Sequence, residues 1–131
     1  MLLKTSIDRR QKEIEIEHRC GQSYNMLHKL KHQLFSSPKY KIISINPDVI
    51  GFEKNNDLIN CYIELRQKGV LLYFRYNQDD YAICGRFNQT VFQSSNNIFD
   101  IQIGNDSVKA EIQHTNAHQK FIAKFLELKA K

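Results

Sequence analysis

The stretch GVLLYFRYNQDDYAICGRF, residues 69–87, contains two runs of branched and aromatic residues on either side of a short acidic turn. Such runs are typical of β-strands, and a connection this short joins antiparallel neighbours. Alternation in the first run places Leu72 and Phe74 on one face and Tyr73 and Arg75 on the other. The stretch therefore predicts a hairpin with one apolar face and one face that carries tyrosine and arginine.

The same two-residue period extends along most of the chain after Tyr40. Turn residues such as Asn46-Pro47 and Gly104-Asn105-Asp106 separate the strand-like segments. These segments are KYKIISI, DVIGFEK, LINCYIELR, GVLLYFRYN, DYAICGRF, NIFDIQIG and SVKAEIQ. We therefore expect an antiparallel meander of six to seven strands.

Helical periodicity flanks these strands on both sides. Leucines recur at helical spacing from Tyr24 to Phe35, and the proline at position 38 ends that pattern. Residues 6–20 are also assigned to helix, although KEIEIEH alternates like a strand and Gly21 separates the two pieces. Near the end of the chain, a helix is predicted from an apolar stripe of Phe121, Ile122, Phe125, Leu126 and Leu128.

This order predicts an α+β protein with segregated helices and strands. We expect a single domain over residues 1–131: a helical N-terminal segment (1–37), an antiparallel sheet (38–113) and a C-terminal amphipathic helix (115–130). A strongly bent sheet or partial barrel would bury the stripe of the last helix best. The element order resembles that of pleckstrin-homology-like folds with an added N-terminal helix, although no residue motif of that family accompanies it.

Composition and cysteine usage predict a cytoplasmic protein. The chain has 131 residues, enough to bury a core without metal or disulfide support. Its three cysteines are odd in number, far apart and without C-x-x-C spacing, which favours free thiols in a reducing compartment. Charges interrupt the first residues where a signal peptide has its apolar core, and no apolar run suffices to span a bilayer.

The excess positive charge lies in the N-terminal third of the sequence. Residues 1–41 hold nine Lys and Arg against four acidic residues, whereas the remaining ninety hold ten of each sign. No acidic residue occurs between Glu17 and Asp48. Residues 18–41 are therefore the segment in which we expect attraction for phosphate, an anionic membrane surface or an acidic protein.

The alternation of three strands can gather tyrosines and arginines on one sheet face. Its members are Tyr62, Arg66, Tyr73, Arg75 and Arg86. Aromatic rings beside guanidinium groups bind single-stranded nucleic acid by stacking and clamping. Alternatively, these side chains form ordinary cross-strand pairs on a solvated face, or pack beneath the N-terminal helix. Whether this face is open or covered decides between the two interpretations.

Four of the histidines form two pairs whose spacing can suit a metal ion. His28/His32 and His114/His118 have a four-residue spacing that chelates zinc or iron when both lie on a helix. The favoured interpretation is nevertheless a solvated or satisfied histidine, with His118 anchoring the start of the last helix.

Asp48 and Glu64 resemble part of the PD-(D/E)-x-K nuclease layout. Arg66 occupies the lysine position, however, and a guanidinium cannot lose its proton. The alternative is a turn aspartate and an exposed strand ion pair. No catalytic residue, metal or cofactor is predicted, since nucleophile and nucleotide motifs are absent and Cys61 shares its face with Ile63 and Leu65 as a buried thiol.

The sequence thus favours a non-catalytic binding or adaptor module over an enzyme. The first expected partner is a protein or a second copy of the chain, bound through the basic N-terminal helical segment. The first alternative is a nucleic-acid-binding protein that uses the basic helix and the Tyr/Arg face. The second alternative is a metal-dependent hydrolase or nuclease. The candidate binding residues are Arg19, Lys29, Lys31, Lys39, Lys41, Tyr62, Arg66, Tyr73, Arg75 and Arg86.

Overall fold

A computed structural model of the chain describes residues 2–5, 8–27, 29, 37–46, 59–76 and 78–130. Its elements, in chain order, are β1 (Leu2–Lys4), α1 (Arg9–Cys20), β2 (Tyr40–Asn46), β3 (Asn60–Leu65), β4 (Gly69–Tyr76), β5 (Asp79–Arg86), the 3-10 helix η1 (Phe87–Gln89), β6 (Thr90–Ser95), β7 (Ile98–Ile103), β8 (Asp106–Ile112) and α4 (Thr115–Lys129). The predicted α+β class and the antiparallel sheet are confirmed.

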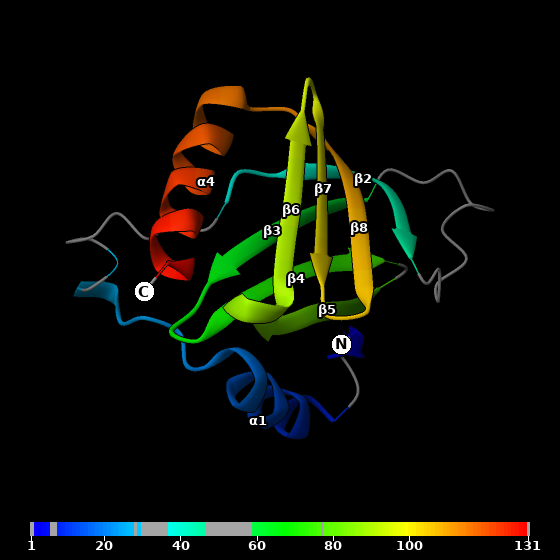
Figure 1. Cartoon of the computed structure of the whole chain (residues 1–131). Coiled ribbons are helices and arrows are strands. Elements are labelled where there is room, and N and C mark those ends of the chain that lie inside the picture. The colour runs from blue at the N-terminus through cyan, green and yellow to red at the C-terminus, as the bar shows by residue number, and fades with distance from the viewer. Residues whose placement is uncertain are drawn as a thin grey trace.

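The strands form one eight-stranded antiparallel sheet in the order β1-β5-β4-β3-β2-β8-β7-β6. Strand β2 joins its two halves, because β2 pairs with β3 at Tyr40 and Lys41 and with β8 along its whole length. The register of β2 against β8 shifts between Ile42 and Ser44. Figure 1 shows β6–β8 running across β3–β5, so the sheet folds over on itself and ends at β1 and β6 without closing into a barrel.

The inner face of the folded sheet holds the main core. Strand β3 contributes Cys61, Ile63 and Leu65 by alternation, and β4 contributes Val70 and Leu72 on the same side. Helix α4 lies across the open side of the two sheet halves (Figure 1) and inserts side chains between them. This placement agrees with the expected burial of an apolar helix stripe within a bent sheet.

The buried stripe of α4 is narrower than its sequence predicts. Phe121 and Phe125 are buried, whereas Ile122 and Leu128 are partly buried. Leu126 is exposed, because it falls on the solvent side of the helix. Its first turn contains His118, which is buried and polar.

Helix α1 packs against the outer face of the sheet. Two of its side chains, Ile16 and Cys20, join a small second cluster with Leu3, Leu71, Ala82 and Cys84. The helix predicted over residues 6–20 is confirmed from Arg9 to Cys20, residues 6 and 7 lie outside the described part, and the strand alternative for KEIEIEH is removed. It ends at Gly21, where φ is +81° and where a Cβ atom would lie 2.9 Å from the Lys68 nitrogen, so glycine suits this position.

Three parts of the sequence-based description need correction or lie outside the described residues. The N-terminal segment 1–37 was predicted as helical, yet it begins with β1, which pairs with β5. Strand β6 was not predicted, because TVFQSS contains only two large apolar residues and forms a sheet edge. The segment DVIGFEK lies outside the described residues, as does most of the predicted helix 24–35. Leu27, from the apolar positions of that helix, is exposed.

Candidate binding groove

A cavity of about 640 Å³ lies between α1 and the outer face of β3, β4 and β5. Arg9, Glu13 and Ile16 form its helical wall, while Tyr62 and Tyr73 belong to the sheet side. The remaining lining residues are Thr5, Asn60, Arg66, Leu71, Phe74, Arg75, Asp80, Tyr81 and Ala82. We call this cavity the α1 groove.

A pair of stacked tyrosines lies in the sheet wall of the groove. Tyr62 and Tyr73 are direct cross-strand partners, and their ring centroids lie 5.6 Å apart with planes inclined by 21°. Each residue is 37% exposed, whereas Phe74 on the opposite face of β4 is buried. Helix α1 covers Leu71 and Ala82 but leaves this pair open. The face is therefore covered at one end and open at the other.

Two exposed arginines stand on opposite walls of the groove. Arg9 of α1 has Glu13 Oε1 at 3.4 Å from its Nε, and Arg75 of β4 has Asp80 Oδ1 at 4.0 Å. The Arg75 side chain is 69% exposed. Ion pairs this exposed contribute little to stability, so either arginine can change partner at small cost.

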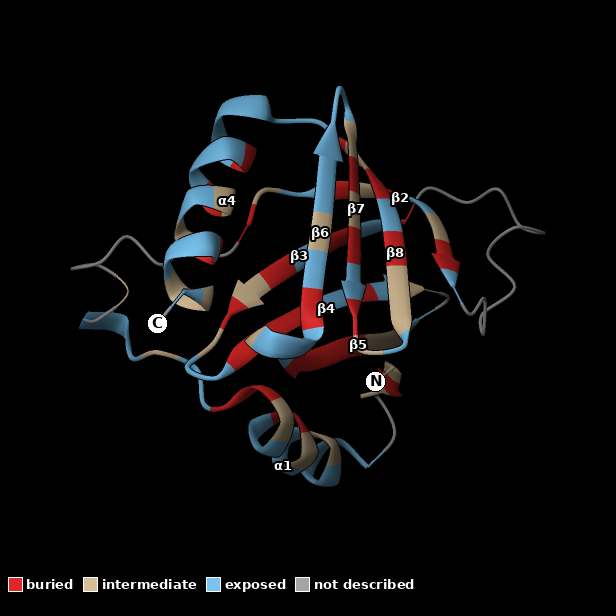
Figure 2. Ribbon diagram, viewed as in Figure 1, coloured by how far each residue is buried: buried red, intermediate tan, exposed pale blue. Residues whose placement is uncertain are grey.

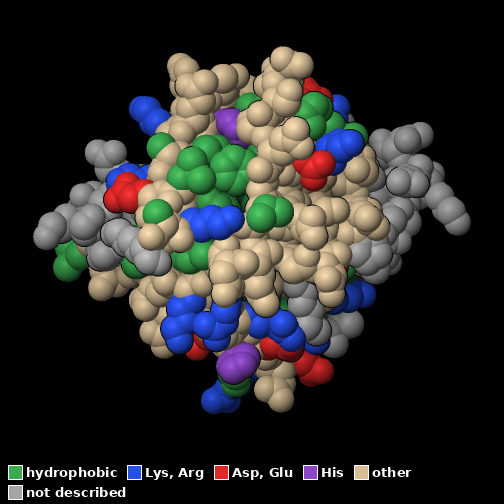
Figure 3. Space-filling view, in the orientation of Figure 1, with side chains coloured by type: hydrophobic (Ala, Val, Ile, Leu, Met, Phe, Trp, Pro, Cys, Tyr) green, Lys and Arg blue, Asp and Glu red, His purple; other side chains and the backbone are tan. Residues whose placement is uncertain are grey.

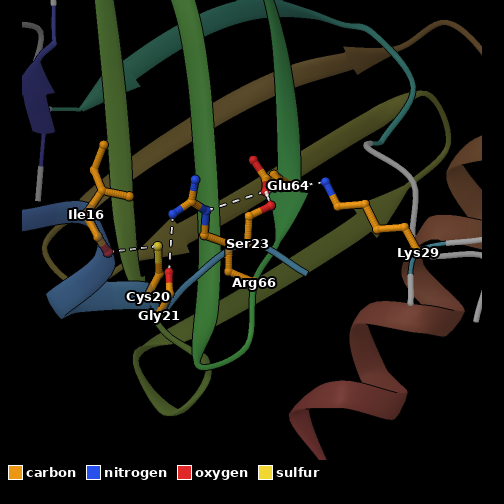
Figure 4. Close-up of polar contacts among 7 residues, drawn as sticks. All are labelled: Ile16, Cys20, Gly21, Ser23, Lys29, Glu64 and Arg66. Atoms are coloured by element: carbon orange, nitrogen blue, oxygen red, sulfur yellow. Dashed lines mark hydrogen bonds and ion pairs between the residues drawn. The ribbon is translucent and has the colours of Figure 1, made fainter. Parts of the chain in front are cut away.

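A polar cluster fixes the end of α1 and the following segment to the sheet (Figure 4). The Glu64 carboxylate accepts a hydrogen bond from Ser23 and lies 3.5 Å from Arg66 Nε and 3.9 Å from Lys29 Nζ. Arg66 also donates through Nη1 to the Gly21 carbonyl oxygen at 3.2 Å. We call Glu64, Arg66, Ser23 and Lys29 the Glu64 clamp.

The clamp changes the interpretation of Glu64 and Arg66. The two residues do pair, but their side chains are only 19% and 16% exposed, whereas an exposed pair was expected. The nitrogen Nε of Arg66 is buried and makes no hydrogen bond. A carboxylate held by a hydroxyl group and two cations is a structural tie between layers. Asp48, the other half of the proposed nuclease pair, lies outside the described residues.

Four of the five residues assigned to the Tyr/Arg face line the α1 groove together. They are Tyr62, Arg66, Tyr73 and Arg75. Arg86 follows the same alternation on β5, but it pairs with Gly69 at the far end of the hairpin and lines a different hollow. Sequence reasoning missed Arg9, Glu13 and Ile16, because only tertiary packing brings α1 over these strands.

Two of the cations in the basic segment 18–41 have carboxylate partners in the folded protein. Arg19 Nη2 lies 3.1 Å from Glu15, and Lys29 meets Glu64 from a distant strand. Lys39 is exposed and Lys41 is half-buried. Lys31, the fifth predicted basic contact, lies outside the described residues.

His118 forms a buried polar trio that sequence reasoning only half anticipated. Its Nδ1 lies 2.6 Å from the Tyr40 hydroxyl, and its Nε2 lies 3.0 Å from Ser94 Oγ. Burial lowers the pKa of His118 and raises that of Tyr40, so both groups are neutral. The prediction that His118 anchors the start of the last helix agrees with these contacts.

The tautomer of His118 follows from the burial of Tyr40. The fully buried hydroxyl needs an acceptor for its proton, and Nδ1 is the acceptor it contacts. The imidazole proton is then on Nε2 and is donated to Ser94. In this state Nε2 cannot take a proton from Ser94, so the trio ties α4 to the sheet and has no activated nucleophile.

All three cysteines are free and buried. Cys61 lies in the main core, as predicted, and burial raises the pKa of its thiol to about 12. Cys20 donates to the Ile16 carbonyl oxygen at 3.2 Å and lies beside Cys84. A hydrogen bond with Cys84 and burial both raise the pKa of the Cys20 thiol. The same hydrogen bond lowers the pKa of the Cys84 thiol, and both side chains pack in the small cluster between α1 and β5.

Within the described ranges, no three His, Cys, Asp or Glu side chains lie close enough together to hold a metal ion. His28 and His32 lie outside those ranges, and His114 precedes α4, so its spacing to His118 is not helical.

None of the helices in the described part of the chain has the length and apolar composition that crossing a membrane requires. Comparisons with protein-family models, curated proteins and solved structures found no match for this chain.

Proposed function

We propose that the protein is a non-catalytic binding module of the reducing cytoplasm and that the α1 groove is its binding site. The observation that carries this proposal is the stacked pair of Tyr62 and Tyr73. Both rings are part-exposed beside a cavity of about 640 Å³, a volume typical of ligand sites. Exposed tyrosines with a fixed orientation supply contact area at little cost in conformational entropy.

A segment of another protein fits this groove best. Its floor includes the apolar side chain of Leu71, Ile16 adds an apolar side chain from the helical wall, and its rim carries charges of both signs. Arg9 and Arg75 offer partners to carboxylates, while Glu13 and Asp80 offer partners to Lys or Arg. A rim of mixed sign with an apolar floor complements a peptide that carries apolar and charged residues. The N-terminal segment takes part in binding by supplying α1 as one wall.

Selection from a displayed library of random peptides tests this proposal. Peptides enriched on the wild-type protein should bind the Tyr73→Ser variant at least about tenfold more weakly, which corresponds to about 1.4 kcal/mol. Arg86→Gln is the matched control, because Arg86 does not line the groove. Failure to enrich any peptide, or equal binding by Tyr73→Ser, would contradict the proposal. Sedimentation of the free protein over a concentration series shows whether a second copy is the partner.

Single-stranded nucleic acid is the second candidate ligand, favoured by Arg75 on the same strand as a stacked tyrosine. A base can stack on the exposed ring, and the guanidinium group can hold the adjacent phosphate. Charge reversal at Lys29 and Lys31 should weaken binding to all sequences, whereas Tyr73→Ala should weaken single-strand binding selectively. Anisotropy of a labelled oligouridine, followed against salt concentration, measures both effects. Wild-type affinity in both variants would remove this candidate.

A further inference from the structure

A second hollow, of about 520 Å³, lies at the far end of the β4–β5 hairpin from the stacked tyrosines. It is formed by the turn before β4, the 3-10 helix η1 and the last turn of α4, with Tyr24 from the segment after α1. Three of its lining residues are cations: Lys68, Arg86 and Lys129. We call it the cationic hollow.

The charges of the cationic hollow differ from those of the α1 groove. Every cation that lines the groove has a carboxylate partner, namely Glu13 for Arg9, Glu64 for Arg66 and Asp80 for Arg75. The residues lining the hollow include no Asp or Glu. Among the residues that the structure describes, no carboxylate forms an ion pair with its three cations.

Uncompensated positive charge in a concave site attracts anions strongly, because the low-dielectric walls focus the field. Figure 3 shows that the Lys and Arg side chains over α1 lie next to Asp and Glu side chains, whereas the residues lining the hollow include no such partner. Lys129 also donates to the Thr90 carbonyl oxygen, which fixes its ammonium group at β6. The position of one of the three cations of the hollow is therefore fixed by the fold.

Hydrogen bonds between the connecting segments hold the backbone of the hollow. The Lys68 nitrogen donates to the Cys20 carbonyl oxygen at 3.0 Å, and the Phe87 nitrogen donates to the Lys68 carbonyl oxygen at 3.2 Å. The turn itself closes through the bond from the Arg66 nitrogen to the Gly69 carbonyl oxygen at 2.8 Å. The Cα atoms that carry Lys68 and Arg86 are thereby fixed relative to each other before any ligand arrives.

We propose that the cationic hollow binds a phosphomonoester. The planar guanidinium group of Arg86 matches two phosphate oxygens, and Lys68 adds a second positive charge. The side-chain amides of Gln67 and Asn88 provide further donors, while Tyr24 and Phe87 contact the organic part of the ligand. This site is separate from the α1 groove. Arg86, which the sequence assigned to the Tyr/Arg face, binds the phosphate group here instead.

Titration of the full-length ¹⁵N-labelled protein with glycerol 3-phosphate, at constant ionic strength set with NaCl, tests the site. We expect saturable shifts of the backbone amides of residues 67, 68, 86 and 88. Arg86→Gln should weaken binding about tenfold, because it removes the bidentate contact. Arg10→Gln is the matched control, since it removes an exposed arginine that lines neither cavity.

Vesicles containing phosphatidic acid present the same phosphomonoester on a lipid. Binding of glycerol 3-phosphate identifies a soluble ligand, whereas binding of the vesicles alone identifies a lipid headgroup, and either must be lost in Arg86→Gln. Non-saturating shifts with glycerol 3-phosphate together with no vesicle binding would overturn the proposal. Equal affinity in Arg86→Gln and Arg10→Gln would also overturn it. Neither result bears on the α1 groove, whose test uses Tyr73.

Discussion

The two faces of the sheet are covered by one helix each, but in different ways. On the inner face, α4 inserts Phe121 and Phe125 into a continuous core built from most strands of the sheet. On the outer face, α1 places only Ile16 and Cys20 in a small cluster, and Ile14 remains exposed. Figure 2 shows the contrast, with buried residues along the inner strands and mostly exposed or intermediate ones on α1.

We expect the inner face to provide most of the stability of the fold and the outer face to provide the binding surface. The main core on the inner face supplies most of the buried apolar surface, so the fold does not require α1 to cover the whole outer face of the sheet. Helix α1 is attached instead by a small cluster and by the Glu64 clamp, which leaves a groove beside it. We expect the amides of α1 to exchange with solvent before those of β3, β4 and β8, because the outer layer opens at lower cost.

The largest effect is expected from truncating the inner helix. Phe125→Ala should lower the free energy of unfolding by about 3–5 kcal/mol, because it leaves a cavity beneath rings of the main core. Leu126→Ala, one residue further along the same helix, removes an exposed side chain and should change it by less than about 1 kcal/mol. Urea denaturation compares the two variants. Similar losses would show that α4 is not packed as described.

The Glu64 clamp should be the most sensitive polar feature of the outer layer. Glu64→Gln leaves Arg66 and Lys29 part-buried without their counter-ion, at a cost of about 2–3 kcal/mol. Glu127→Gln is the control, because it removes a more exposed partner of Lys124, worth about 0.5 kcal/mol or less. Hydrogen exchange of α1 should accelerate only in Glu64→Gln. Unchanged exchange of the α1 amides in Glu64→Gln would contradict the claim that the Glu64 clamp attaches α1 to the sheet.

His118 gives the inner layer a dependence on pH. Burial lowers its pKa below the ordinary value of 6.5, so the unfolded chain takes up a proton at a higher pH than the folded protein does. Stability should therefore be fully present above about pH 6.5 and decline as the pH falls below that value. The groups around the imidazole, Tyr40, Ser94 and Phe99, carry no charge that would retain the proton.

Replacing His118 by a residue that does not titrate tests the dependence of stability on pH. His118→Gln should cost about 1–2 kcal/mol at neutral pH, because an amide cannot match both hydrogen bonds of the imidazole. Its melting temperature should then fall less steeply than that of the wild type between about pH 7 and pH 5. Parallel curves for the two proteins would show that His118 is not the titrating group.

The smallest stability effect is expected on the exposed part of the outer face. Tyr73→Ser should cost no more than about 1 kcal/mol, since it removes one member of a part-exposed cross-strand pair. The same substitution should have the largest effect on binding to the α1 groove. Thermal denaturation and peptide binding, measured on one preparation, should therefore rank Tyr73→Ser and Phe125→Ala in opposite orders. A stability loss for Tyr73→Ser as large as that for Phe125→Ala would contradict the assignment of stability to the inner face and of binding to the outer face.

Sequence periodicity was sufficient for the parts of the molecule that local alternation determines. It predicted the β4–β5 hairpin, the burial of Cys61 and the C-terminal helix, because in each case one face must be apolar. It also placed Tyr62 and Tyr73 on one face. Strand β6 escaped prediction because an edge strand with few apolar residues lacks that signal.

The remaining features depend on contacts between distant residues. The pairing of Lys29 with Glu64, the covering of Leu71 by α1 and the separation of Arg86 from Tyr73 follow from how the layers meet. Charge counting assigned the excess to residues 18–41, but tertiary structure brings the Glu64 carboxylate to Lys29 from a distant strand. Likewise, Lys68, Arg86 and Lys129 line one hollow although no single stretch of sequence brings them together.

The position of β2 in the sheet also affects how the chain folds. Tyr40 pairs with Cys61 on one side and with Ile112 on the other, so the strand that joins the two halves has one neighbour far along the chain. Pairings between distant residues slow folding, because a long loop must close before they form. During synthesis on the ribosome β3, β4 and β5 can pair early, but β2 keeps one edge unpaired until β8 has emerged. Until then, the nascent protein presents an open strand edge that is prone to wrong pairing or aggregation.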